Sequence, residues 1–177
     1  MEHKAFLFDE KVFQKELALV LYEALEHGDT APIQSFIEEN REQLTDPYEG
    51  ALLDESWETM LEFRTPEEYG DLALTKYYRV LEDIGLGGAW DEVDDYLKEW
   101  QEGLSVTILG KPFGPKKRLF DPGKMGSYFQ SPEKAAESLE RLIEHGRTYP
   151  QRKQQLAQAV ELLEKAVQAG QGLYVTF

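Results

Sequence analysis

Residues 104–130 limit the fold more than any other segment of this 177-residue chain. Four glycines and three prolines lie from Gly110 to Gly126, and a segment so rich in these residues does not form a long helix or strand. Residues 104–130 carry five Lys and Arg residues against one Asp, whereas residues 1–103 carry 8 Lys and Arg against 27 Asp and Glu. A basic, turn-rich segment therefore follows a strongly acidic first part of the chain.

Apolar residues recur every three or four positions on both sides of this segment, which indicates amphipathic helices. Residues that favour the start of a helix accompany this pattern. Free N–H groups at a helix start can be capped by Asp9, Thr30, Thr65 and Ser131, and a proline follows closely after the last three. We expect seven helices: residues 9–27, a helix that begins at residue 30, and residues 46–63, 65–84, 89–101, 131–146 and 150–170.

Two segments alternate apolar and polar residues with the period of a strand, residues 104–109 and residues 172–177. We expect these strands to pair. Because two strands alone are marginally stable, the pair should either lie on the helices or recruit a third strand, for which residues 118–120 are the candidate. The predicted fold is mainly α, with about seven helices and a small antiparallel β element. It is expected to be a single compact α+β domain spanning residues 1–177, with a Gly/Pro-rich basic strand–loop insert at residues 104–130.

The composition excludes several classes of protein. The chain has no cysteine, which excludes a disulfide framework, a Cys-ligated zinc site and a Cys nucleophile. No apolar run reaches the roughly 18 to 20 residues of a membrane helix, and the first residues lack the pattern of a signal peptide. We therefore expect a cytoplasmic protein. Its formal net charge of −15 disfavours nucleic acid and anionic membranes as partners. The acidity indicates either a basic protein partner or a role in solubility alone.

The basic segment is a candidate site for an anionic small molecule. Glycines let the backbone approach an anion closely, and successive N–H groups can surround it. The spacing matches no phosphate-binding motif, so the competing interpretation is that the cations neutralise the carboxylates of residues 91–95 or are simply solvated. Asp121-Pro122-Gly123 predicts a tight turn after them. The candidate ligands are Lys111, Lys116, Lys117, Arg118, Lys124, Ser127 and Tyr128.

A second candidate is an acidic face for a basic partner on the helix expected at residues 89–101. It comprises Asp91, Glu92, Asp94 and Asp95, which lie away from the apolar seam of that helix. Their spacing does not match a calcium-binding loop, so no metal site is predicted. The competing interpretation is an ordinary solvated helix face.

The remaining chemistry-bearing residues give no catalytic motif. His27 and His145 stand near predicted helix ends, where a protonated imidazole would complement the helix dipole. Trp57, Trp90 and Trp100 lie on apolar stripes and are expected in the core, although Trp90 and Trp100 could instead anchor a partner. The chain contains neither HExxH nor GxSxG, so no catalytic residue and no cofactor is predicted.

Two functional hypotheses follow from these patterns. The first is a non-enzymatic, cytoplasmic protein-binding module that regulates or inhibits a basic protein partner. The alternative is an enzyme or sensor that binds a phosphate- or carboxylate-bearing small molecule at residues 110–128.

Overall fold

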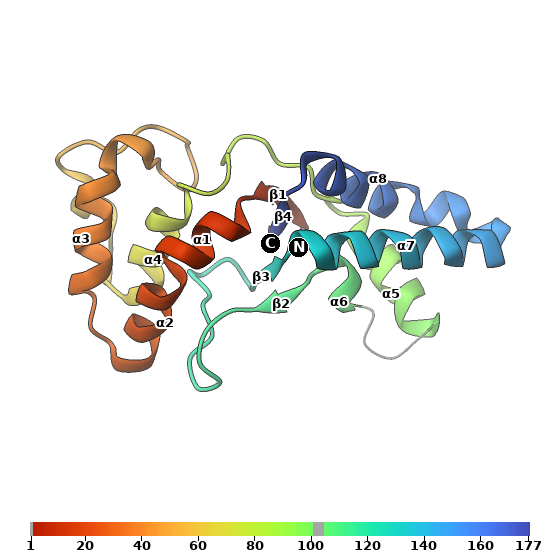
Figure 1. Cartoon of the computed structure of the whole chain (residues 1–177), viewed down its shortest axis with the longest axis horizontal. Coiled ribbons are helices and arrows are strands. Elements are labelled where there is room, and N and C mark those ends of the chain that lie inside the picture. The colour runs from red at the N-terminus through yellow and green to blue at the C-terminus, as the bar shows by residue number, and fades with distance from the viewer. Residues whose placement is uncertain (1, 101–104) are drawn as a thin grey trace. The chain divides into compact units, whose positions relative to one another are not determined.

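The computed structural model describes residues 2–100 and 105–177. Its contacts group the chain into two compact units. Unit 1 comprises Met1–Glu10, Ile84–Lys111 and Tyr128–Phe177, and unit 2 comprises Lys11–Asp83 and Pro112–Ser127. The predicted fold class is confirmed, because helices dominate and the strands form one small antiparallel sheet (Figure 1). The expectation of a single domain stays a prediction.

The sheet is built mainly from unit 1 and has the strand order β1-β4-β3-β2. The strands are β1 (Lys4–Phe8), β2 (Lys111–Pro112), β3 (Ser127–Gln130) and β4 (Gly172–Thr176). β1 and β4 pair antiparallel from Lys4 opposite Thr176 to Phe8 opposite Gly172. Gly172 is required in β4 because a Cβ atom there would collide with the carbonyl oxygen of Gln130. The predicted C-terminal strand is therefore confirmed, and it is buried along its whole length.

The partners predicted for that strand are wrong. Ser105–Ile108 form a short helix, α6, instead of a strand, and Leu104 lies outside the described residues. Residues 118–120 form no strand either, because the Phe120 N–H donates to the Phe113 carbonyl oxygen within a loop. The true neighbours of β4 are β1 and β3. A β1–β4 pair joins the two ends of the sequence, which periodicity alone does not reveal.

The helices of unit 1 are α5 (Trp90–Trp100), α6, α7 (Pro132–Thr148) and α8 (Lys153–Ala169). α7 and α8 lie side by side (Figure 1). The Ser131 hydroxyl caps α7 by accepting from the N–H of Lys134, as predicted, but the helix continues past Gly146 to Thr148. A buried aliphatic cluster in unit 1 includes Val93, Leu97, Leu142, Leu156, Leu163, Leu173 and Val175, and Phe8 and Tyr174 of the same unit are also buried.

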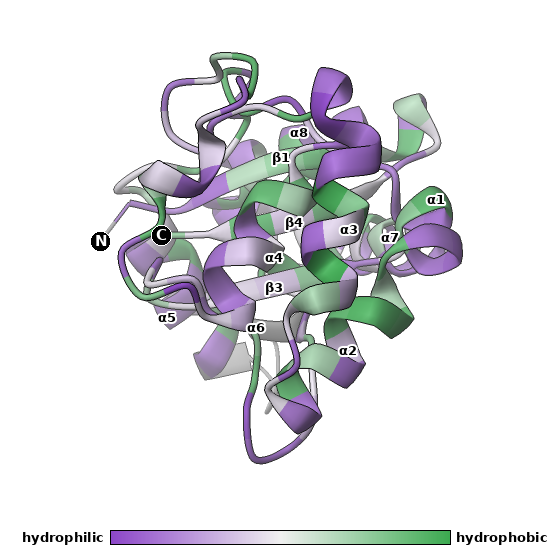
Figure 2. Ribbon diagram, turned by 90° about the vertical axis from the view of Figure 1, so that its left-hand side faces the viewer, coloured by the Kyte–Doolittle hydropathy of each residue, from purple (hydrophilic) through white to green (hydrophobic). Residues whose placement is uncertain are grey.

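The helices of unit 2 are α1 (Glu10–Glu16), whose first residue is counted in unit 1, α2 (Ala18–His27), α3 (Ala31–Asn40) and α4 (Pro66–Leu74). Hydrophilic and hydrophobic residues are interleaved along α3 (Figure 2), as expected for a helix with one buried face. The helix predicted at residues 9–27 is interrupted at Leu17. Gly28 ends α2 in the left-handed conformation, with φ of 77°, as predicted.

The helix predicted at residues 46–63 does not form. The Asp46 carboxylate does cap the N–H groups of Tyr48 and Glu49, at 2.7 and 2.6 Å. The chain then turns back at Gly50, whose φ is 71°, and Leu52 forms a bridge with Thr45. A single 3₁₀ turn at Trp57–Met60 is the regular structure in this segment. The Asp46 carboxylate thus accepts N–H hydrogen bonds, as a capping residue does, but it stabilises a turn and no helix follows.

The helix predicted at residues 65–84 begins as expected and ends early. Thr65 and Glu68 form a capping box at the start of α4. α4 ends at Leu74, because the Thr75 hydroxyl donates to the Leu72 carbonyl oxygen at 2.7 Å and accepts from the Thr45 N–H at 3.0 Å. These bonds tie the chain after α4 to the segment that follows α3.

Candidate functional site

The basic segment of unit 2 is a loop held firmly at both ends. Phe113 lies edge-on to Phe13 and Tyr22, with ring centroids 5.4 and 6.4 Å apart. Phe120 is buried and donates its N–H to the Phe113 carbonyl oxygen at 2.8 Å. Between these anchors, the Arg118 N–H donates to the Pro115 carbonyl oxygen at 2.9 Å, which closes a tight turn. That turn exposes Lys116 and Lys117 to solvent.

Arg118 forms a two-pronged ion pair with Glu67 in the first turn of α4. Its Nε and Nη2 atoms lie 2.6 and 2.7 Å from the two carboxylate oxygens. Partial burial acts to raise the pKa of Glu67, but the hydrogen bonds and charge of Arg118 outweigh this effect and lower that pKa. The guanidinium fork of Arg118 is therefore occupied by a carboxylate of the same unit.

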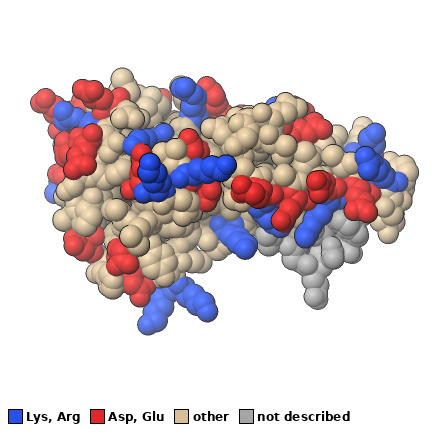
Figure 3. Space-filling view, viewed as in Figure 1, with Lys and Arg blue, Asp and Glu red and all other residues tan. Residues whose placement is uncertain are grey.

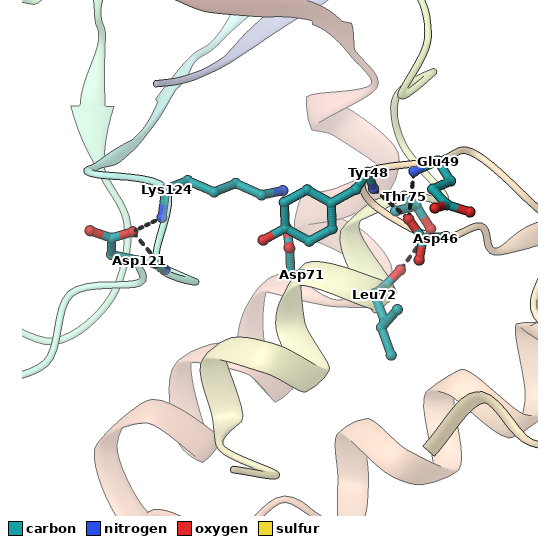
Figure 4. A network of polar contacts seen from close by, with 9 residues as sticks. Asp46, Tyr48, Glu49, Asp71, Leu72, Thr75, Asp121 and Lys124 are labelled. Atoms are coloured by element: carbon teal, nitrogen blue, oxygen red, sulfur yellow. Dashed lines mark hydrogen bonds and ion pairs between the residues drawn. The ribbon is translucent and has the colours of Figure 1, made fainter. Parts of the chain in front are cut away.

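Lys124 forms a buried ion pair with Asp71 on α4 (Figure 4). The Nζ and Oδ1 atoms are 2.7 Å apart, and the two residues are 9% and 4% exposed. Burial raises the pKa of Asp71, against the opposing charge and hydrogen bond of Lys124. The centroid of the Tyr48 ring lies 5.0 Å from the ammonium group, which the ring covers. The turn predicted at Asp121-Pro122-Gly123 is present, because Asp121 Oδ1 accepts from the N–H groups of Gly123 and Lys124.

The structure divides the predicted anion ligands between the two units. Lys116, Lys117, Arg118, Lys124 and Ser127 belong to unit 2, and Ser127 is buried. Lys111 and Tyr128 belong to unit 1, where the Tyr128 ring lies edge-on to Phe177. Arg118 and Lys124 are paired with carboxylates of unit 2, whereas the competing interpretation paired the cations with residues 91–95. The carboxylates are those of Glu67 and Asp71.

The acidic face predicted on α5 is smaller than expected. Asp91, Glu92 and Asp95 are exposed, but Asp94 is buried and lies 2.6 Å from the ammonium group of Lys98. Trp90 is half-buried against the ring of Phe177, at 4.9 Å. The side chain of Trp100 lies outside the described residues. Of the four residues predicted for this face, Asp91, Glu92 and Asp95 thus remain exposed.

Sequence reasoning missed a surface on residues 46–63, which we call the acidic loop. It contains six Asp and Glu residues and no Lys or Arg. In Figure 3 acidic side chains, with basic ones among them, lie over the region where Figure 1 places α3. Four large apolar side chains of the loop are nevertheless exposed, by 46 to 71%: Tyr48, Leu52, Met60 and Phe63. The apolar stripe that predicts a helix here includes Leu52 and Met60, and a helix would bury both residues, whereas the loop exposes them.

The acidic loop has little regular structure, yet hydrogen bonds hold it throughout. Near its start, the Asp46 N–H donates to the Ala51 carbonyl oxygen at 2.7 Å. In its middle, Trp57 is buried and donates from Nε1 to Glu38 at 2.7 Å. At its end, the Glu68 carboxylate accepts from the N–H groups of Glu62, Phe63 and Thr65. The exposed apolar side chains are therefore presented on an ordered backbone.

A buried histidine lies in unit 1. His145 on α7 is 2% exposed, is hydrogen-bonded through Nε2 to the Tyr96 hydroxyl, and lies against the Tyr149 ring at 4.7 Å. Arg152 covers the Tyr96 ring at 4.6 Å. Burial, followed by the charge of Arg152, lowers the pKa of His145. The predicted dipole-complementing role of this residue is therefore not favoured, because that role needs the protonated form.

Comparisons with protein-family models, with curated proteins and with solved structures found no match to this chain. Within residues 2–100 and 105–177, no helix combines the length and the apolar character that crossing a membrane requires. The same residues contain no group of three or more His, Asp or Glu side chains placed to hold a metal ion. The functional argument therefore depends on the surfaces described above.

Proposed function

We propose that this protein is a protein-binding module that binds a basic protein partner through the acidic loop of unit 2. The observation that carries the proposal is the combination of exposed apolar side chains and six Asp and Glu residues, with no Lys or Arg among residues 46–63, on one hydrogen-bonded loop. As in the hypothesis from the sequence, the role is non-enzymatic and cytoplasmic. Regulation or inhibition of the partner is the biological consequence we infer from it.

The length of the acidic loop supports this role. Connections longer than about 12 to 15 residues without regular structure are uncommon in compact units, and they usually carry function. The segment from the end of α3 to the start of α4 exceeds that length, and its helical structure is limited to two short 3₁₀ turns, Arg41–Gln43 and Trp57–Met60. Its hydrogen bonds also reduce the conformational entropy that a partner must remove on binding.

The charge of the loop selects the class of partner. Glu49, Glu55 and Glu62 are exposed in a segment that has no basic residue. Such a surface attracts cationic groups and repels nucleic acid and anionic lipid. The apolar side chains between the carboxylates supply area that a purely electrostatic contact lacks. The alternative, an anion site at residues 110–128, stays a prediction, and the pairing of Arg118 and Lys124 gives it no added support.

Selection from a display library of short random peptides tests the proposal. We expect the selected peptides to be rich in Lys and Arg, and we expect a Glu49→Lys/Glu55→Lys/Glu62→Lys variant to lose their binding. The matched control is Glu26→Lys/Glu39→Lys/Glu42→Lys, which changes the net charge equally at exposed positions elsewhere in unit 2. Equal loss in both variants, or no loss in the first, would contradict the proposal.

A further inference from the structure

We propose that the acidic loop binds a large apolar side chain of its partner on a patch around Gly50, and that basic residues flank this anchor in the partner. The Gly50 patch is formed by Tyr48, Leu52 and Leu81. The inference rests on the proposed function and adds to it the chemistry of the partner segment.

Gly50 brings Leu81 to the acidic loop. A Cβ atom on Gly50 would lie 3.0 Å from Cγ of Leu81, so the leucine packs directly over the glycine backbone. The φ of 71° at Gly50 is also a conformation that other residues adopt at a cost. Tyr48 and Leu52 each stand two residues from Gly50, in the turn that the Thr45–Leu52 bridge closes. Two segments of unit 2 thus contribute apolar side chains to one turn.

The side chains of the Gly50 patch remain open to solvent. Tyr48 is 67% exposed, Leu52 is 69% exposed and Leu81 is 76% exposed. Scattered exposed leucines are ordinary, but a group of large apolar residues on an ordered turn is typical of an interaction site. Covering these side chains with an apolar group of a partner would remove their surface from water.

Lys124 holds Tyr48, one of the three residues of the Gly50 patch, in position. Its ammonium group is held by Asp71 at 2.7 Å and contacts the Tyr48 ring at 5.0 Å (Figure 4). The ring is therefore placed by a buried ion pair, while most of its surface stays exposed. Lys124, which the sequence suggested as an anion ligand, here acts as a positioning residue for Tyr48.

The charges beside the patch determine what flanks the anchor. Glu49 follows Tyr48 and Glu82 follows Leu81, and both glutamates are exposed. Glu82 lies 3.7 Å from Arg79, and both side chains of that pair are well exposed, so solvent screens it strongly. A partner that places Lys or Arg on either side of a Leu, Phe or Trp residue matches this arrangement of apolar and anionic groups.

The test uses two synthetic peptides of equal charge, one with a central Trp between Lys and Arg residues and one with Ser in its place. Fluorescence anisotropy gives their affinities for the full chain. We expect the Trp peptide to bind the wild type about tenfold more tightly than the Ser peptide. Leu81→Ala and Leu52→Ala should each weaken binding of the Trp peptide by about tenfold and leave that of the Ser peptide unchanged.

Leu19→Ala is the matched control, because Leu19 is 70% exposed on α2 of the same unit. It should leave both affinities unchanged, and thermal unfolding should show that all three variants are folded. The inference is overturned if the two peptides bind alike, or if Leu81→Ala and Leu52→Ala retain wild-type affinity. Retained affinity in these variants, together with loss in the loop charge-reversal variant, overturns the Gly50 patch alone. Retained affinity in all of them overturns the proposed function as well.

Discussion

The ammonium group of Lys124 lies 2.7 Å from the carboxylate of Asp71, and both side chains are almost completely removed from solvent. The two residues are 53 positions apart in the chain. This ion pair ties the basic loop to α4, and the Tyr48 ring above it connects both to the acidic loop. A residue that resembles an anion ligand in the sequence is thus part of the framework of unit 2.

Removal of one partner from this pair should be strongly destabilising. We expect Lys124→Met to lower the free energy of unfolding by about 3–5 kcal/mol, because it leaves the Asp71 carboxylate buried without a countercharge. The double variant Lys124→Met/Asp71→Leu should recover most of the loss. Urea denaturation measures both, with Lys117→Met as the exposed control. If the single and double variants lose the same free energy of unfolding, the unpaired charge of Asp71 is not the cause of the loss.

The Arg118–Glu67 pair predicts a loss of stability in acid. The pKa of Glu67 is lowered in the folded protein from its ordinary value of 4.5. The pair's contribution is therefore present above pH 4.5 and is lost as the pH falls through the lowered pKa. Glu67→Gln should cost about 1 kcal/mol at neutral pH and less at low pH. Urea midpoints across this range check the prediction, and a cost that does not depend on pH would contradict it.

His145 predicts a second pH dependence, in unit 1. Its pKa is lowered from 6.5, so folding favours the neutral ring packed among Tyr96, Tyr149 and Arg152. The unfolded chain binds the proton more readily, and stability should fall as the pH decreases from 6.5 toward the lowered pKa. His145→Gln should lower stability above pH 6.5 by about 1–3 kcal/mol and remove this pH dependence. An unchanged slope in the variant, measured by urea denaturation, would exclude the assignment.

Gly50 offers a test of how Leu81 is held. Gly50→Ala should destabilise the protein by about 1–2 kcal/mol, because alanine is strained at φ of 71° and its methyl group meets Leu81. Gly123→Ala is the matched control, since Gly123 also has a positive φ, of 83°, but no atom within 4 Å of the added Cβ. Thermal unfolding of the two variants isolates the Leu81 contact. An equal effect at both glycines would show that this contact is easily displaced.

The sequence predicted those parts of the fold that local chemistry determines. Thr65 and Ser131 cap their helices as expected, and the alternating residues after Gly170 form β4. The predictions failed for segments whose structure depends on contacts with residues far away in the sequence. β1 was missed because β4, which covers it, lies at the other end of the chain. The stripe at residues 46–63 resembled a helix face, yet Leu53 and Trp57 are buried while Leu52 and Met60 are exposed.

The sequence predicted the positive charge of the basic segment but not the ion pairs that its residues form. The cations at 116–118 and 124 were identified from the sequence, but the carboxylate partners of Arg118 and Lys124 lie about fifty residues away on α4. No local pattern identifies such partners. The absence of basic residues from the acidic loop was readable in the sequence, whereas the exposure of its apolar residues was not, because the predicted helix gave way to a turn at Gly50 and a loop.

The central claim is most directly tested by mapping where the Trp-containing basic peptide binds, using backbone amide chemical shifts of the labelled full chain. We predict that the largest shift changes occur at residues 46–63 and at Leu81, with small changes on α5 at Asp91, Glu92 and Asp95. Shift changes concentrated on α5, or spread evenly over all acidic surfaces, would contradict the account.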